Sequence, residues 1–267
     1  MYKLYNDLLY NIKIKLINNL IYNQSLDYME QYNKFYILPF IINIFPIFKY
    51  NLLFKQNYKI IKYIFKKVVP KTEKNHYIEK TIRISSVNGY YKAIKLILKD
   101  ENADPSLDNN FAIQFASEKG YYKIVKLLLK DKRVDPSINE NQPIRYASKF
   151  GNYKIVKLLS KDKRVDIYCE SNYPFSWACL NGHYKIAKYL LKKFPGLDLY
   201  ILKNSLILNT IVFSKHYKII KLLINRKKFK TNKNINKIIE SGINFHIETN
   251  KNGENDNIIK ILKNFKK

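Results

Sequence analysis

Side chains that could act as nucleophiles, general bases or metal ligands are few in this 267-residue chain. The histidines are His76, His183, His216 and His246, and none lies near a recurring acid or nucleophile in the sequence, as a catalytic base would. The chain also has no GxxxxGK[ST] phosphate loop, GxGxxG turn, HExxH helix or GxSxG elbow. The sequence therefore predicts a protein that is not an enzyme.

Two further sets of residues bear on metal binding. Cys169 and Cys179 form no CxxC pair and have no suitably spaced histidine, so the pattern does not favour zinc. Asp104, Asp135 and Asp166 recur every 31 residues, and a ladder of carboxylates could hold a cation. Aspartate before Pro-Ser also forms turns by hydrogen-bonding its own backbone, and this is the stronger interpretation. We expect no metal and no cofactor.

A glycine recurs with the same period of 31 residues and marks an internal repeat. The glycines are Gly89, Gly120, Gly151 and Gly182. Each is followed by a tyrosine, a lysine, two apolar residues and a second lysine, in segments that begin at Tyr91, Tyr122, Tyr153 and Tyr184. Diverged copies begin at Tyr58 and Tyr217.

Each repeat has the pattern of two helices joined by a turn. In one unit, residues 113–118 are apolar or small, Gly120 ends a helix, and residues 122–130 are apolar with helical periodicity. Residues 135–137, Asp-Pro-Ser, then supply a turn before the next unit. A single unit cannot bury its apolar face, so we expect neighbouring units to stack into a solenoid.

These units resemble ankyrin repeats, whose first helix starts with Thr-Pro-Leu-His-x-Ala and whose second helix follows Gly-His. The matching segments are residues 111–116, 142–147 and 173–178, and Asn181-Gly182-His183 follows the last of them. Gln114, Arg145 and Ser176 replace the family's histidine, which should weaken its hydrogen-bonded turn, and the period of 31 implies short fingers. The lysine-, asparagine- and isoleucine-rich style resembles the ankyrin proteins of giant DNA viruses and AT-rich protists.

The predicted fold is all-α: an ankyrin-repeat solenoid of stacked helix–turn–helix units, with short β-turn fingers and helical terminal caps. We expect the repeat array at residues 52–230, clearest at 80–200, between an N-terminal helical cap at 1–51 and a C-terminal helical cap or tail at 231–267. Residues 257–262 near the C-terminus could form one more diverged second helix.

Phe115, Tyr146 and Trp177 stand immediately before the repeated alanine, a position that the resemblance places in a concave groove. Exposed rings there would anchor a partner protein, although the same rings could instead be buried between repeats. The neighbouring pairs differ from unit to unit, as a recognition surface should. The predicted partner-binding residues are Phe115, Glu118, Lys119, Tyr146, Lys149, Phe150, Trp177, Leu180 and Asn181.

A ladder of lysines gives an alternative function, the electrostatic binding of nucleic acid or another polyanion. Lysine and arginine exceed the acidic residues by 49 to 21, and the net charge is +28. On stacked second helices the lysines would form a stripe along the outer face: Lys92, Lys95, Lys123, Lys126, Lys154, Lys157, Lys185 and Lys188. A solvated face of an AT-biased protein would look the same.

The leading prediction is a non-catalytic interaction module that binds an unidentified partner protein through its groove and fingers. The most apolar stretch, residues 35–48, contains Pro39 and Pro46 and is too short for a transmembrane helix. With no secretory signal pattern and no paired cysteines, we expect an intracellular location, the cytoplasm or, if the protein is viral, the host cytoplasm.

Overall fold

The computed structural model describes residues 74–197, 212, 216–226, 233–250 and 253–266. The predicted N-terminal cap, the apolar stretch at 35–48 and the copy that begins at Tyr58 lie outside these residues. The chain divides into two compact units, Met1–Ala112 and Ile113–Lys267. All regular secondary structure in the described residues is α-helical.

In the first unit, α6 (Lys74–Asn88) packs against α7 (Tyr91–Ile97). These helices bury Ile78, Ile82 and Ile94, each no more than 5% exposed. The next helix, α8 (Leu107–Glu118), begins in this unit and ends in the second. Arg83 on α6 lies over the ring of Phe111, 4.1 Å from the guanidinium carbon to the ring centroid, and pairs with Asp108.

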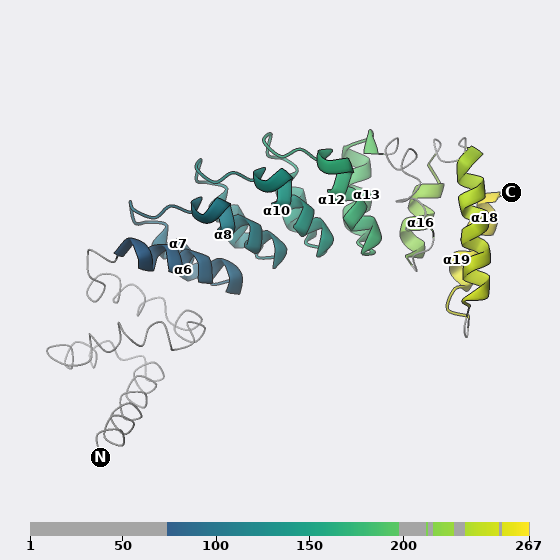
Figure 1. Cartoon of the computed structure of the whole chain (residues 1–267), viewed down its shortest axis with the longest axis horizontal. Helices are drawn as coiled ribbons and strands as arrows, with labels where there is room; N and C mark the ends of the chain where they lie inside the picture. Colours follow the sequence, from purple (N-terminus) through teal and green to yellow (C-terminus); the bar gives the residue numbers. More distant parts are fainter. Residues whose placement is uncertain (1–73, 198–211, 213–215, 227–232, 251–252, 267) are drawn as a thin grey trace, which may run out of the picture. The chain divides into compact units, whose positions relative to one another are not determined.

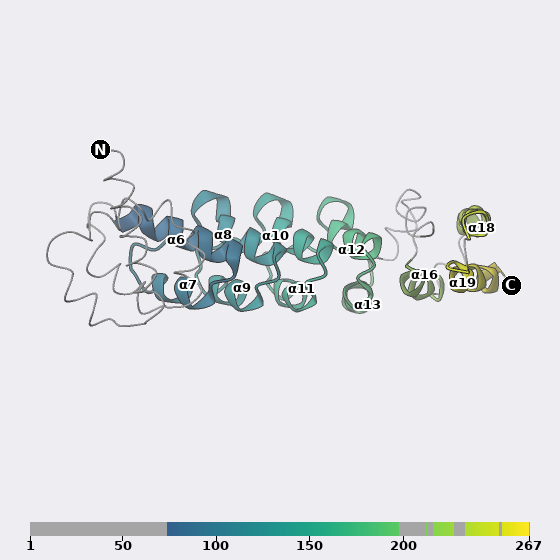
Figure 2. The ribbon, with the colours of Figure 1, turned by 90° about the horizontal axis from the view of Figure 1, so that it is seen from below.

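The second unit consists of helix pairs in two rows (Figures 1 and 2). First helices α10 (Ile138–Lys149) and α12 (Cys169–Leu180) pack side by side. Second helices α9 (Tyr122–Leu128), α11 (Tyr153–Leu159) and α13 (Tyr184–Lys193) form the other row, and α16 (Tyr217–Ile224) follows α13. This arrangement confirms the predicted all-α fold of stacked helix–turn–helix units for the described residues.

At the end of the chain, α18 (Lys233–Glu248) packs against α19 (Asp256–Lys266), which also contacts α16. Residues 257–262 are therefore helical and extend the row of second helices, in agreement with the prediction. Gly242 on α18 lies against the Val212 side chain, and a Cβ atom at this glycine would overlap it. The domain boundaries drawn from the sequence stay a prediction.

The second helices bury one face because equivalent positions along each of them are apolar. Ile124, Val125 and Leu128 of α9 are at most 1% exposed, and α11 buries the equivalent Ile155, Val156 and Leu159. Burial of each such side chain stabilises the fold by about 1.5–3 kcal/mol. The lysines between these positions lie on the opposite face, as helical periodicity requires.

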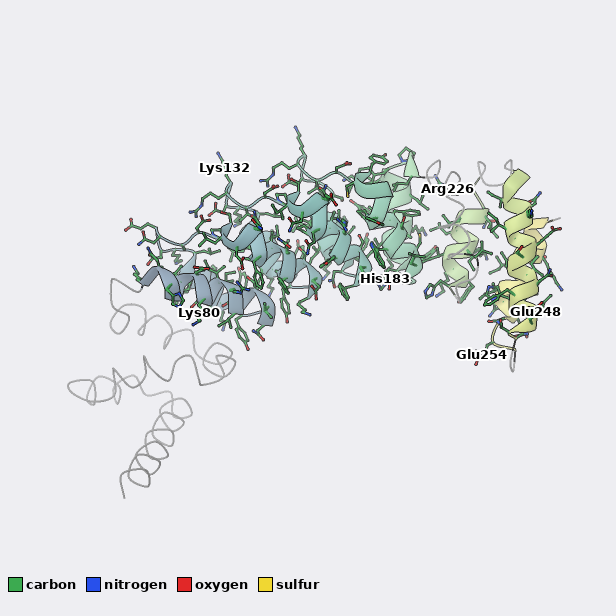
Figure 3. The ribbon with its side chains drawn as sticks, viewed as in Figure 1. Lys80, Lys132, His183, Arg226, Glu248 and Glu254 are labelled. Carbon is green, nitrogen blue, oxygen red and sulfur yellow. The ribbon has the colours of Figure 1, made fainter. Side chains whose placement is uncertain are left out.

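Polar side chains at the start of α11, α13 and α16 and near the end of α18 tie adjacent helix pairs together. The Nε2–H of His183 donates to the Lys149 carbonyl at 2.8 Å, and that of His216 donates to the Leu180 carbonyl at 3.1 Å. Asn152 donates from Nδ2 to two carbonyls at the end of α8, and the His246 Nε2–H donates to Val212. These bonds satisfy carbonyls at the ends of helices that the helices themselves leave unpaired. Figure 3 shows His183 where α12 turns into α13.

The recurring aspartates form turns, which confirms the turn interpretation. Asp135 accepts hydrogen bonds from the Ser137 N–H and hydroxyl at 2.8 and 2.6 Å, and Asp104 accepts the equivalent pair from Ser106. Asp166 accepts the N–H of Tyr168 at 2.8 Å. Each carboxylate is therefore engaged by its own loop.

The short fingers contain a left-handed turn that the sequence analysis did not predict. Asn139, Glu140 and Asn141 have φ of 48°, 57° and 61°, and Asp108 to Asn110 adopt the same conformation. Asparagine and aspartate tolerate this region better than other side chains. Asn141 is held in addition by its Oδ1, which accepts the N–H of Asp166 at 2.8 Å. Pro143 then falls in the first right-handed turn of α10, where proline needs no N–H partner.

Gly151→Ala should destabilise the second unit by about 1–2 kcal/mol or more, because alanine is strained in the left-handed region. Gly151 has φ +78°, and a Cβ atom there would lie 2.7 Å from the His183 ring. Urea unfolding followed by circular dichroism measures the loss. Gly196→Ala is the control, since Gly196 is exposed and has no positive φ. Equal stability of the two variants would contradict the proposed constraint.

Asp162→Asn should cost stability at neutral pH and little at strongly acidic pH. The hydrogen bond from Arg164 lowers the pKa of Asp162 below its ordinary value of 3.8, and the backbone N–H and charge of Arg164 act in the same direction against desolvation. The ionised carboxylate thus stabilises the folded state above pH 3.8, and this contribution disappears as the pH falls through the lowered pKa.

Urea unfolding of wild type and Asp162→Asn between pH 7 and pH 2 measures this difference. Arg164 also donates to the Val134 carbonyl of the preceding finger at 2.8 Å, so the ion pair joins two fingers. In an Arg164→Met background the effect of Asp162→Asn should shrink at neutral pH. A difference that stays constant with pH would rule out the ion pair as its cause.

Candidate functional site

Aromatic and basic side chains gather where α10 and α12 pack side by side. Residues at a spacing of four share one face of a helix, and this relation holds for Arg145 with Lys149 and for Tyr173 with Trp177. We call the surface formed by these four residues together with Tyr146 and Phe150 the first-helix surface. Phe150 directly follows α10 and is 50% exposed, and Tyr173 is 37% exposed.

Cations and rings alternate across this surface. The Lys149 Nζ lies 4.7 Å from the Trp177 ring centroid and 5.6 Å from that of Phe150. One helical turn away, the Arg145 guanidinium lies 5.0 Å from the Tyr173 centroid. Cation–ring contacts of this kind are worth about 0.5–1 kcal/mol at exposed sites. The cluster thus joins the two helices through side chains that stay accessible to solvent.

The rings also contact one another. Tyr146 meets Phe150 edge to face, with centroids 6.3 Å apart and planes at 85°. Tyr173 and Trp177 lie 6.4 Å apart at 38°. Aromatic pairs favour such offset and edge-to-face arrangements. The first-helix surface therefore contains one aromatic pair from each helix, and Lys149 contacts a ring of both pairs.

The structure places four of the nine predicted partner-binding residues on this surface. Phe115, Tyr146 and Trp177 are all half-buried. They are therefore neither fully exposed nor fully buried between repeats, the two alternatives that the sequence left open. Tyr146, Lys149, Phe150 and Trp177 come together in the cluster, and Leu180 and Asn181 end α12. At the same repeat position at the end of α8, Lys119 pairs with Glu118 at 2.9 Å. The binding role of these residues stays a prediction.

Arg145 and Tyr173 belong to the surface and were missing from the predicted set. Arg145 replaces the histidine of the family pattern, and its Nη1 lies 3.4 Å from the carbonyls of Asn139 and Glu140 in its own left-handed turn. We expected the replacement of histidine by Arg145 to weaken the turn, but Arg145 itself supplies contacts to the turn. The spacing of four from Lys149 and Trp177 would have revealed both residues.

The lysine ladder lies on the second helices of both units. In the second unit all of its lysines are exposed: Lys123, Lys126, Lys154, Lys157, Lys185, Lys188, Lys218 and Lys221. Lys92 and Lys95 on α7 are exposed in the first unit. The sequences of α9, α11, α13 and α16 contain no acidic residue. We call the eight lysines of the second unit the lysine surface.

The acidic residues of the repeats lie outside these second helices, and two of them, Asp131 and Asp162, are in the fingers. Asp131 and Asp162 are engaged there by Arg133 and Arg164, at 2.7 and 2.8 Å. Lys132, at the tip of the connection between α9 and α10, is exposed (Figure 3). The second helices α9, α11, α13 and α16 thus carry only basic charges, whereas acidic and basic residues occur together in the fingers.

The cysteines have the environment of structural residues. Cys179 is fully buried, and burial raises the pKa of its thiol. Burial and the nearby Asp166 carboxylate raise the pKa of Cys169 to about 11. Because the thiolate is the reactive form of cysteine, neither residue is suited to nucleophilic chemistry near neutral pH.

Sequence comparison identifies a family. The ankyrin repeat family, described as ankyrin repeats (3 copies), matches residues 82–171 and 144–237, together more than half of the chain. No curated protein matches the sequence. In the described residues no helix is long and apolar enough to cross a membrane.

Proposed function

Since this chain belongs to the ankyrin repeat family, whose repeats serve as non-catalytic protein-binding scaffolds, we propose that it holds a partner protein on its first-helix surface and fingers. The observation that carries this proposal is the aromatic cluster across α10 and α12. Phe150 and Tyr173 expose 50% and 37% of their surface beside the half-buried Tyr146 and Trp177.

Such a cluster is suited to protein recognition because tyrosine, tryptophan and arginine contribute most to protein interfaces. Rings that already touch their neighbours lose little side-chain entropy when a partner binds. The residues that vary between repeats, Glu118-Lys119, Lys149-Phe150 and Leu180-Asn181, occupy the same position at the end of each first helix. They are therefore placed to set specificity on a constant framework.

This proposal includes a cytoplasmic location. It also includes the resemblance to ankyrin proteins of giant DNA viruses. The viral resemblance is supported by composition, since lysine, asparagine and isoleucine are abundant in the chain, and the location is supported by the absence of paired cysteines. The family match supports the ankyrin fold and the role as a scaffold, and it does not bear on location or viral origin.

Replacing Phe115, Tyr146 and Trp177 together by alanine should abolish capture of the partner protein. Because these rings are half-buried, the double variant Phe150→Ala/Tyr173→Ala provides a second test on the most exposed rings, and it should weaken capture about tenfold or more. Pull-down from cell lysate at high salt with nuclease measures capture, and circular dichroism confirms folding.

Lys154→Ala/Lys157→Ala is the matched control, because it changes two exposed side chains of α11 on the other row. Capture by the double ring variant at the wild-type level, with the fold intact, would exclude the first-helix surface as the binding site.

The purely basic charge of the second helices α9, α11, α13 and α16 supports a second candidate function, polyanion binding along the lysine surface. Eight exposed lysines on four adjacent second helices meet no acidic residue within those helices. A polyanion that neutralises several of them would release bound counterions, so that binding would weaken steeply with salt.

The quadruple variant Lys154→Gln/Lys157→Gln/Lys185→Gln/Lys188→Gln should reduce the salt dependence of duplex DNA binding. Removing one lysine–phosphate pair makes the slope of log K against log salt shallower by about 0.9 for B-form DNA. Fluorescence anisotropy over a salt series measures the slope. Wild-type binding that does not change with salt would reject this candidate.

A further inference from the structure

The ammonium group of Lys149 occupies an unusual position on the first-helix surface. It lies between two rings, 4.7 Å from the Trp177 centroid and 5.6 Å from the Phe150 centroid. The backbone of the same residue is held as well, because its carbonyl accepts the Nε2–H of His183 at 2.8 Å. Contacts with the next repeat thus position both the main chain and the side chain of this residue.

Within the described residues, Lys149 has no carboxylate partner, whereas several other cations of the second unit have one. Arg133 pairs with Asp131, Arg164 with Asp162 and Lys119 with Glu118. Arg145, one turn earlier on α10, contacts the Glu140 carboxylate at 3.4 Å. Lys149 is therefore a half-buried cation whose position is set by rings and whose charge is left for an external anion.

The rings around Lys149 favour a peptide over a nucleic acid as the source of that anion. Single-stranded nucleic acids bind aromatic platforms by stacking bases on free ring faces. Here Lys149 lies over one face of Trp177, and Tyr173 lies beside the same ring. The exposed part of Phe150 lies beside the Lys149 ammonium group, so this part of the surface presents a positive charge next to an apolar patch.

We propose that the first-helix surface binds an acidic peptide segment of the partner protein. A carboxylate of the segment pairs with Lys149, and an adjacent apolar side chain packs on Phe150 and Tyr146. This inference rests on the proposed function and specifies the chemistry of the partner. The net charge of +28 adds a long-range attraction for the same segment.

Three fluorescein-labelled probes test the proposal with the full chain: a short peptide of alternating glutamate and leucine, the same peptide with glutamine for glutamate, and oligothymidylate. Fluorescence anisotropy gives their dissociation constants. Wild type should bind the glutamate peptide about tenfold more tightly than the glutamine peptide at physiological salt.

Lys149→Met keeps most of the side chain's apolar volume and removes its charge, so it should weaken binding of the glutamate peptide by about three- to tenfold and leave the glutamine peptide unaffected. Lys237→Met makes the same change of charge at an exposed site on α18, outside both surfaces, and should alter neither. Phe150→Ala should weaken both peptides alike, because it removes the apolar contact.

Equal binding of the two peptides by wild type would overturn the inference, as would equal losses in Lys149→Met and Lys237→Met. Oligothymidylate binding that depends on Lys149 would also overturn it and make nucleic acid the ligand of this surface. The proposed function fails separately, when the double variant Phe150→Ala/Tyr173→Ala captures the partner protein as wild type does.

Discussion

A hydrogen bond from one repeat to the helix end of the previous repeat organises the second unit. His183, His216, His246 and Asn152 each donate to backbone carbonyls 34 to 36 positions earlier in the sequence. For Asn152, His183 and His216, the donor side chain lies where a Cβ atom of the preceding repeat glycine would be, so glycine and donor are required together. The acceptors of Asn152, His183 and His216 lie at the ends of the first helices α8, α10 and α12, so the same bonds that stack the repeats also hold the ends of these helices.

Lys149 illustrates how this constraint connects packing with binding. Its carbonyl belongs to the stacking bond, and its side chain lies across the rings of the next first helix. On the other row, the lysines project from helices whose apolar phases are fully buried. One scaffold therefore presents two surfaces of different chemistry, an aromatic one with positioned cations and a purely basic one. Protein recognition is proposed for the first because rings give contact area, whereas lysines alone give mainly salt-dependent attraction.

Several features of the fold and site could be read from the sequence, for identifiable reasons. The buried phases of α9 and α11 follow from helical periodicity, and the turns at Gly120 and Gly151 follow from the backbone freedom of glycine. The turn role of Asp135 follows from its short side chain. The left-handed turn at residues 139–141 was missed because it is held by a tertiary hydrogen bond. The N–H of Asp166 in the next finger donates to the Asn141 side chain. Arg145 was seen as a loss from the family pattern, since its contacts with its own loop depend on that turn.

The sequence by itself determined the repeat length, the pairing of helices, the buried phases and the positions of the turns, because periodicity and backbone preference act over neighbouring residues. Only the tertiary structure decided which side chains of successive repeats meet. The contacts of Lys149 with Trp177, of Arg145 with Tyr173 and of His183 with the Lys149 carbonyl join residues 28 to 34 positions apart. Such contacts depend on the distance and register at which the helices stack, and no local pattern in the chain specifies that geometry.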